Sequence, residues 1–567
     1  MSATSAQDND DVMQRGVIGL PFSPDATTLP FPISPEGNPF FGPSASNADR
    51  QQTLRIARLG KALFWDEQLS SDNTMACGTC HFPESGGIDP RPGRIAPNGV
   101  RGSEGMHPQD TLQDYFSDPA FIDGAPPTKR VTGFNAPSMI NAAFSETLFW
   151  LETAGPGLET VNGNGVLLPG FEEYAALEAL ALVPPVSNVE MAHDGLSWES
   201  GEIQNKLANS TALRYASPSS IPPDLADLVG KNYEQLFSST FGANGGPAVT
   251  RLRFARAIAH YIRTLVSDQA PVDLPQGQGG LTPLMAQGFG IMRKNNCLNC
   301  HSASATPELA VDPDTGQRSG GFVNKFDAYL SRGGDDLISV NLPGTDHDID
   351  VKVPSLRNVG LRPRFFHTGL IESQDELLDF YEGAFDGPDD FPIPATRFMT
   401  PLTAAQRNAV AAFLFEGLTD PRVAQALPPF DRPDLYSERL NALGPNANII
   451  DKGTGSPGLL DPPSIIANNP LAFDRDEFKV GLEGGLPGAF GLLQLSLIPH
   501  SLPQQPGAQI ANILTVLDGD GTGTVRLAQV PSGALIGTTW FGRWVTYEAV
   551  NGSVIFAISD EASFLVQ

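Results

Sequence analysis

The stretches CGTCH at Cys77–His81 and CLNCH at Cys297–His301 are the most informative segments of the chain. Each reads C-x-x-C-H, a pattern typical of covalent c-type haem attachment. In that chemistry two thiols form thioethers to the haem vinyl groups, and the adjacent histidine becomes an axial ligand of the iron. The two motifs therefore predict two covalently bound haems, one for each half of the chain.

The cysteine inventory supports this interpretation. The chain has four cysteines, and the motifs use all of them: Cys77, Cys80, Cys297 and Cys300. A single C-x-x-C could also be a redox dithiol or half of a zinc site. Both motifs end in a histidine, His81 and His301, and no cysteine is left over, which favours haem over these alternatives.

Length and charge limit the classes of function. The 567 residues suffice for three or four domains of ordinary size. The formal net charge of −28 argues against nucleic acid and anionic membranes as partners, and it suits attraction of a basic electron donor. No stretch approaches the ~18 consecutive apolar residues of a transmembrane helix.

The N-terminal residues, MSATSAQDNDD, lack the basic and apolar regions of a signal peptide. Haem attachment to C-x-x-C-H motifs nevertheless normally takes place outside the cytoplasm. We therefore expect a periplasmic or otherwise exported protein, and we interpret residue 1 as the start of a trimmed chain.

Apolar spacing and capping residues predict a plan that occurs twice. Helices are predicted from Gln51 towards the first motif, over 251–266, and over 282–295 towards the second motif. Thr403 and Gln406 have the spacing of a capping box for a further helix. Each half therefore reads as helix, haem motif, long loops and helix.

Composition divides the chain further. We expect an N-terminal extension over 1–50, a first haem domain over 51–248, a second over 249–435, a Gly/Pro/Asn-rich linker over 436–484 and a small β domain over 485–567. Short β-like runs lie at 491–498, 510–517, 523–530, 538–548 and 553–558. The expected fold is mainly α, with two c-type cytochrome-like haem domains, long loops and a C-terminal antiparallel β domain.

The segment Asp518–Gly523, DGDGTG, looks like part of a calcium loop. An EF-hand needs a glutamate at its twelfth position, where this chain has Gln529. A hairpin turn between the flanking runs is therefore favoured.

The sequence around the motifs resembles the bacterial di-haem cytochrome c peroxidases and their relative MauG, over about residues 51–435. The matching segments occur in order: Leu59–Asp66 (LGKALFWD), Leu69–Ser70, Asn135–Ser138 (NAPS), Asn141–Ala143, Phe149–Trp150, Asn188–Met191 (NVEM), Arg263–Ser267 (RTLVS), Val353–Val359 (VPSLRNV) and Phe366–Gly369 (FHTG). The resemblance implies an enzyme that reduces H2O2 at the first haem. Electrons would pass through the second haem from a small redox protein such as a cytochrome c or a cupredoxin.

The resemblance also implies catalytic residues at the first haem. Glu190 matches a distal glutamate, which can move a proton between the two peroxide oxygens as general base and then acid. Pro184 matches a second distal-pocket position, although Leu180 stands where a glutamine is usual. Trp150 matches the tryptophan between the two haems, although the Asp-Gly-Arg that usually follows it is absent. A solvated glutamate and a packed tryptophan are the alternatives.

Tyr381 lies fourteen residues after His367, where the peroxidases carry a methionine and MauG a tyrosine. As distal ligand of the second haem, a deprotonated tyrosine oxygen would stabilise oxidised iron and lower the potential relative to a thioether. Tyr381 thus favours MauG-like oxidation of a side chain on a partner protein. The alternative is an aromatic side chain packed on a helix face.

A calcium ion between the haem domains is a further implication. Asn135 matches its side-chain ligand, and backbone carbonyls of Leu361–Phe365 would supply the others. In this chain Arg362 and Arg364 bring positive charge into that stretch.

The remaining histidines have weaker assignments. His107 is a candidate removable distal ligand of the first haem, and His367 is expected to be structural. Surface or core positions are expected for the others: His193, His260, His347 and His500.

Two functions from other classes stay open. A di-haem electron carrier would lack peroxidase activity, and an open first distal site facing Glu190 would argue against it. A di-haem oxygenase would need an apolar access channel for an organic substrate.

Overall fold

The computed structural model describes residues 47–96, 100–106, 129–142, 148, 176–242, 245–274, 278–295, 297, 301, 338–341, 348–351, 354–384, 399–435, 437–438, 448–450, 464–467, 478–483, 485–486, 488–500, 509–517, 521, 523–527, 538–550 and 553–565. The predicted N-terminal extension falls outside these residues except for its last four, which begin the first helix. Within the described stretches, no helix combines the length and apolar character needed to cross a membrane.

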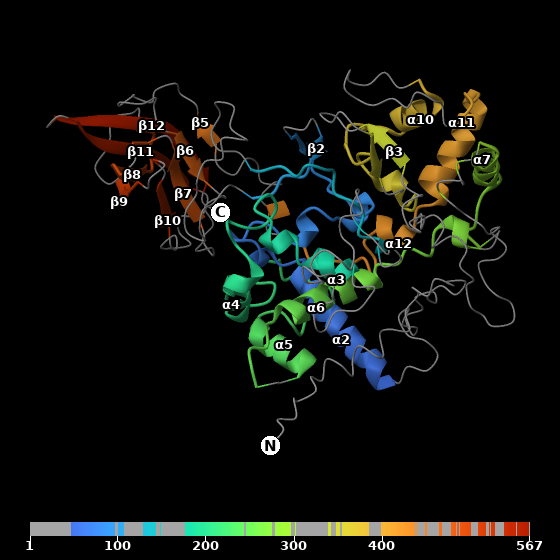
Figure 1. Cartoon of the computed structure of the whole chain (residues 1–567), viewed down its shortest axis with the longest axis horizontal. Coiled ribbons are helices and arrows are strands. Elements are labelled where there is room, and N and C mark those ends of the chain that lie inside the picture. Colours follow the sequence, from blue (N-terminus) through green and yellow to red (C-terminus); the bar gives the residue numbers. More distant parts are fainter. Residues whose placement is uncertain are drawn as a thin grey trace.

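In the first half, the haem motif follows a long helix. The apolar spacing predicts both α2 (Asn47–Phe64) and α6 (Arg251–Thr264), and the two helices pack against each other. Helix α6 thus belongs to the core of the first half, although the expected boundary assigned 249–435 to the second haem domain. The crossing is close because residue 60 is a glycine: a Cβ there would overlap the carbonyl group of Ala257. Three shorter helices pack around this pair (Figure 1), namely α3 (Ala176–Ala181), α4 (Glu202–Ala208) and α5 (Tyr233–Phe241).

The second half repeats this arrangement. Helix α7 (Pro283–Lys294) leads to the second motif and packs against α11 (Ala404–Ala411) and the π-helical turn Ala412–Gly417. A Cβ at Gly288 would overlap the carbonyl group of Ala409. Thr403 and Gln406 form the predicted capping box. Both halves therefore hold the helix before the motif against a later helix through one glycine, in agreement with the predicted plan.

Short elements occupy the long loops. Helix α10 (Gln374–Glu382) begins with a capping box of Ser373 and Glu376, and α12 spans Pro421–Ala424. Strand β1 (Arg94–Ile95) pairs with β2 (Arg101–Gly102), and β3 (Ile338–Asn341) pairs with β4 (Asp348–Val351). The 3-10 turns lie at Glu67–Leu69, Cys77–Thr79, Pro83–Ser85, Pro184–Val186, Trp198–Ser200, Pro271–Asp273 and Val359–Leu361.

The C-terminal region forms antiparallel sheets, as predicted (Figure 1). One sheet has the order β10 (Gly523–Leu527), β7 (Phe478–Glu483) and β6 (Ser464–Ala467). The other has the order β5 (Asn448–Ile450), β12 (Ser553–Leu565), β11 (Thr539–Val550), β8 (Phe490–Ser496) and β9 (Gln509–Val516). The buried indole of Trp544 on β11 donates to the carbonyl of Gly481 on β7 at 2.9 Å, which joins the two sheets.

Two expectations about this region need correction. Strands β5, β6 and β7 lie within 436–484, so this stretch contributes to the sheets and is not only a linker. The predicted hairpin turn at Asp518–Gly523 is wrong, because β9 and β10 belong to different sheets. Strand periodicity identifies a strand but not its partner, which tertiary packing decides.

Residues 421–435, here called the return segment, lead from the second half back to the first. Its buried apolar side chains belong to the core of the first half: Val423, Phe430 and Leu435. Asp431 forms an ion pair with Lys61 at 2.8 Å, and Arg432 forms one with Glu84 at 3.1 Å. The return segment therefore follows the second half in the chain and packs in the core of the first half.

Candidate functional site

One cavity of about 560 Å³ reaches both motifs. Cys77, Cys80 and His81 line it on one side, and Cys297 and His301 line it on the other. Cys300 lies outside the described residues. Folding thus brings together two motifs that stand 220 positions apart in the sequence.

Both motif histidines are set up as neutral metal ligands. The Nδ1 of His81 lies 3.2 Å from the carbonyl oxygen of Gly87, and burial lowers the pKa of His81. Burial also lowers the pKa of His301 to about 4, and the nearby Pro354 opposes that shift. When Nδ1–H donates to a carbonyl, Nε2 keeps the lone pair that iron requires.

The cysteines of the first motif do not have the environment of a redox dithiol. Cys77 and Cys80 are not joined in a disulfide, and burial raises the pKa of each thiol to about 12. Reactive dithiols and metal-binding cysteines instead have a lowered pKa. The first motif therefore lacks the lowered thiol pKa that is typical of a redox dithiol.

Trp65, in the segment that leads to the first motif, shapes the haem-binding loop. A Cβ at Gly78 would overlap the Trp65 ring, so the loop lies directly against the indole. The indole N–H donates to the hydroxyl of Tyr261 on α6 at 3.0 Å, and both side chains are buried. The motif thus rests on the α2–α6 crossing, a support that sequence reasoning did not predict.

Glu190 lines the same cavity on the side of the first motif. Burial raises the pKa of its carboxyl group, and a hydrogen bond from Ser187 opposes that shift. It stands in the turn that follows the 3-10 helix Pro184–Val186. A carboxyl group whose pKa is raised towards neutrality can both accept and return a proton.

Three contacts hold the turn that carries Glu190. The backbone N–H of Met106 donates to the Glu190 carbonyl at 3.2 Å, and a Cβ at Gly105 would overlap the Val189 carbonyl. The guanidinium of Arg130 donates to the Asn188 carbonyl at 3.0 Å. These supports come from distant, unpatterned positions, so no sequence signal identified them.

Pro184 also lines the cavity, and so does Leu180. The side chain that replaces the usual glutamine therefore adds apolar surface to the cavity wall. Trp150 and His107 lie outside the described residues, so their predicted roles stay predictions.

The second side of the cavity carries Tyr381, near the end of α10. Its ring contacts Phe366 at 6.1 Å and Phe380 at 5.5 Å between centroids. A second candidate iron ligand, Met399, is buried in the same wall, and its N–H donates to the Tyr381 carbonyl at 3.2 Å. Sequence reasoning missed Met399, because it lies beyond the position where a ligand was expected.

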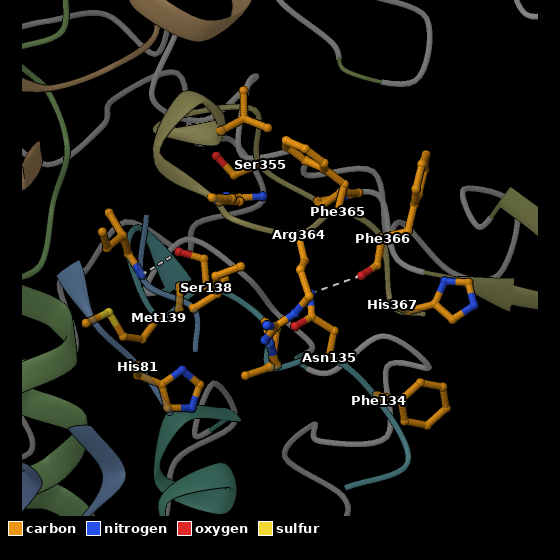
Figure 2. A pocket seen from close by; sticks show the side chains of 18 of the residues that line it. His81, Phe134, Asn135, Ser138, Met139, Ser355, Arg364, Phe365, Phe366 and His367 are labelled. Carbon is orange, nitrogen blue, oxygen red and sulfur yellow. Dashed lines mark hydrogen bonds between the residues drawn. The ribbon is translucent and has the colours of Figure 1, made fainter. Parts of the chain in front are cut away.

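The wall between the two motifs contains Asn135 (Figure 2). Its backbone N–H donates to the His367 carbonyl at 2.8 Å, and its side-chain Nδ2 donates to the Phe366 carbonyl at 3.2 Å. Arg362 and Arg364 line the same cavity. The side-chain Nδ2 of Asn135 is thus engaged within the protein, and the guanidinium groups of Arg362 and Arg364 bring positive charge to the wall where the resemblance implies a calcium ion, which disfavours a divalent cation there.

The other described histidines are structural, as expected. His193 accepts or donates a 2.9 Å hydrogen bond with the Ser71 hydroxyl, and His260 is buried on α6. His367 packs against Phe134, and His500 contacts Glu561 in the β region at 2.8 Å. His347 lies outside the described residues.

Comparisons with known proteins match this chain to the family that its motifs resemble. Residues 55–278 match the family model for "Di-haem cytochrome c peroxidase". The chain is 26% identical to cytochrome c peroxidase Ccp of Escherichia coli over 320 residues, which are 56% of this chain and 50% of that protein. It is 25% identical to the methylamine utilization protein MauG of Methylophilus methylotrophus, covering 58% of this chain and 73% of that protein.

One solved structure is also similar. The crystal structure of a MauG-like protein associated with microbial copper homeostasis aligns at 21% identity and a TM-score of 0.42, over 66% of this chain and 92% of that one. A TM-score this low does not establish a shared overall fold.

The two motifs line one cavity, and the match to a di-haem family agrees with the prediction of two haems. Residues 55–278 thus match the di-haem cytochrome c peroxidase family model, and the similar proteins include a cytochrome c peroxidase and a MauG protein. The chain spans about half the length of the Escherichia coli relative.

Proposed function

We propose that this protein is an exported di-haem peroxidase that reduces H2O2 at the first haem, with electrons relayed through the second. The main support is the single cavity that reaches both motifs and has Glu190 in its wall. The residues that would hold the haems are Cys77, Cys80 and His81 for the first, and Cys297, Cys300, His301 and Tyr381 for the second.

The bound haems would supply iron that exchanges electrons with peroxide. Reduction of one H2O2 to two waters consumes two electrons and two protons, and the chain must deliver those protons. The Glu190 carboxylate takes the proton from one peroxide oxygen and returns it to the oxygen that leaves as water. Burial favours this role, because it raises the pKa of Glu190.

The electron donor is proposed to be a small redox protein, a cytochrome c or a cupredoxin. Two one-electron transfers from such a donor would restore the resting enzyme. The formal net charge of −28 favours a donor with a basic surface, because opposite charges accelerate encounter.

A second candidate function is MauG-like oxidation of a side chain on a partner protein. Tyr381 in the cavity wall favours it. An anionic oxygen ligand would hold the second haem at a lower potential, which favours storage of both oxidising equivalents.

Optical and EPR spectroscopy of the holoprotein, with and without H2O2, tests the proposal. We expect peroxide to change the spectrum of the first haem within the mixing time, and a reduced donor to restore it. A spectrum unaffected by H2O2 would instead identify an electron carrier. Oxygen consumption with an organic substrate, without a requirement for peroxide, would identify an oxygenase.

A further inference from the structure

Arg364 links the two halves of the chain at the cavity wall. It follows the 3-10 turn Val359–Leu361 of the second half, and its side chain is only 3% exposed. One terminal nitrogen donates to the Arg91 carbonyl and the other to the Asp89 carbonyl, at 3.1 Å in the second case. Both acceptors belong to the loop after the first haem motif, more than 270 positions earlier in the chain.

The acidic groups nearby are already engaged by other arginines. Asp89 pairs with Arg91 at 2.7 Å, and Glu372 pairs with Arg101 at 2.9 Å. Among the residues that the structure describes, Arg364 forms no ion pair of its own. Burial correspondingly lowers the pKa of Arg364, and the neighbouring Arg101 and Arg91 contribute to that shift.

A guanidinium in this position binds the same groups that a structural divalent cation binds. Calcium gathers backbone carbonyl oxygens from separate segments. The Arg364 guanidinium gathers two such oxygens from the first half, and its own backbone belongs to the second half. The next segment, Phe366–His367, supplies the carbonyls that accept from Asn135. A divalent ion added to this wall would be repelled by Arg362 and Arg364.

We propose that the Arg364 guanidinium takes the place of the calcium ion that the family resemblance implies, so that the two haem sites are joined by an arginine. The proposal concerns cohesion and metal content, and it is independent of the reaction catalysed. It predicts a holoprotein that binds no stoichiometric calcium and does not respond to calcium chelation.

The test uses the full-length holoprotein after passage over a chelating resin. Calcium content is measured by elemental mass spectrometry, and the melting temperature is measured with EGTA and with CaCl2. We expect substoichiometric calcium and equal melting temperatures. One calcium ion per chain, together with a lower melting temperature in EGTA, would overturn the proposal.

Variants test the guanidinium itself. Arg364→Gln should have a lower melting temperature than the wild type. The melting temperature of Arg364→Lys should lie between the two, because lysine keeps the positive charge but cannot donate to two carbonyls with the planar geometry of a guanidinium. The matched control is Arg422→Gln, since Arg422 is also mostly buried and donates to the Val266 carbonyl and to Asp268, away from the cavity. CaCl2 should raise the melting temperature of Arg364→Gln only.

Two results would contradict the proposed role of the Arg364 guanidinium. One is an Arg364→Gln protein with the wild-type melting temperature. The other is an equal calcium response in Arg422→Gln. If Arg364→Gln does not fold, the calcium content of the wild type and its response to EGTA still decide the matter.

Discussion

At the scale of the residue, the chemistry depends on how each side chain is held. Glu190, the proposed proton carrier, stands in a turn whose backbone is held by Gly105, Met106 and Arg130. The predicted iron ligand His81 has its ring oriented by the carbonyl of Gly87. In each case the functional side chain is visible in a motif, and its supports are not.

Replacing Glu190 by Gln should leave both haems bound and slow the reaction with peroxide by roughly 10²–10⁴-fold, as expected for loss of a positioned proton carrier. The wild-type rate constant should fall as the pH is lowered through the pKa of Glu190, because only the carboxylate can accept the first proton. Since burial raises that pKa, the fall should begin above the usual carboxyl range. Stopped-flow mixing measures both effects. A Glu190→Gln profile that matches the wild type would remove Glu190 from the reaction.

Replacing Tyr381 by Phe should abolish the low-spin EPR signal of the second haem if the Tyr381 oxygen ligates the iron. Tyr381→Met should keep a low-spin haem and raise its potential, because a thioether stabilises oxidised iron less than a phenolate does. EPR and redox titration measure these changes, with Tyr547→Phe in the β region as the control.

The Met399→Leu variant distinguishes between the two candidate iron ligands, Tyr381 and Met399. If this variant alone loses the low-spin signal, Met399 is the ligand and the MauG-like interpretation loses its main support.

At the scale of the element, the two halves share one mode of helix packing. The helix before each haem motif touches a later helix through a glycine, Gly60 in α2 and Gly288 in α7. Helix α7 also contains a matched control for Gly288, namely Gly290, where an added Cβ would meet no atom within 4 Å.

Gly288→Ala should therefore destabilise the protein by about 1–3 kcal/mol, the usual result of overpacking. Gly290→Ala should stabilise it by roughly 0.5–1 kcal/mol, because alanine is the better helix former. Urea unfolding of the holoproteins measures both. Equal effects of the two substitutions would show that the α7–α11 contact is looser than described.

Sequence reasoning performed well where signals are local. Helix α7 and the capping box before α11 follow from periodicity and side-chain chemistry within a few residues. The described residues of the two motifs line one cavity, which the sequence did not predict. Strands β5 to β7 were missed because they are short and surrounded by turn residues. Gly105 and Arg130 were missed because each acts on a partner that is remote in sequence, and Met399 was missed because it lies beyond the position where a ligand was expected. Arg364 was noted only for its charge, and its contacts with the first half were not predicted.

At the scale of the whole molecule, the return segment decides how the halves behave together. Arg432 lies over the rings of Phe82 and Trp65, at 4.4 and 5.2 Å from their centroids, and pairs with Glu84 and Glu438. Lys61 is 4% exposed and contacts both Asp224 and Asp431. These contacts hold the return segment, which follows the second half in the chain, against the core of the first half.

Arg432→Gln should lower the free energy of unfolding by about 1–3 kcal/mol, through loss of cation–π and ion-pair contacts in a partly buried place. It should also separate the thermal transitions of the two halves. Calorimetry of the holoprotein measures this, with Arg407→Gln as control, because Arg407 pairs only with residues of the second half. A single sharp transition in Arg432→Gln would indicate that other contacts provide the coupling.

The return segment also has a consequence for biosynthesis. The core of the first half includes Val423, Phe430 and Leu435, which the ribosome makes only after the whole second half. A nascent chain of the first half alone has an incomplete interior. At roughly 5–20 residues per second, it waits on the order of ten seconds for its last apolar side chains. The first half therefore cannot complete its core before the rest of the chain has been made, which keeps an early, partly synthesised product from folding by itself.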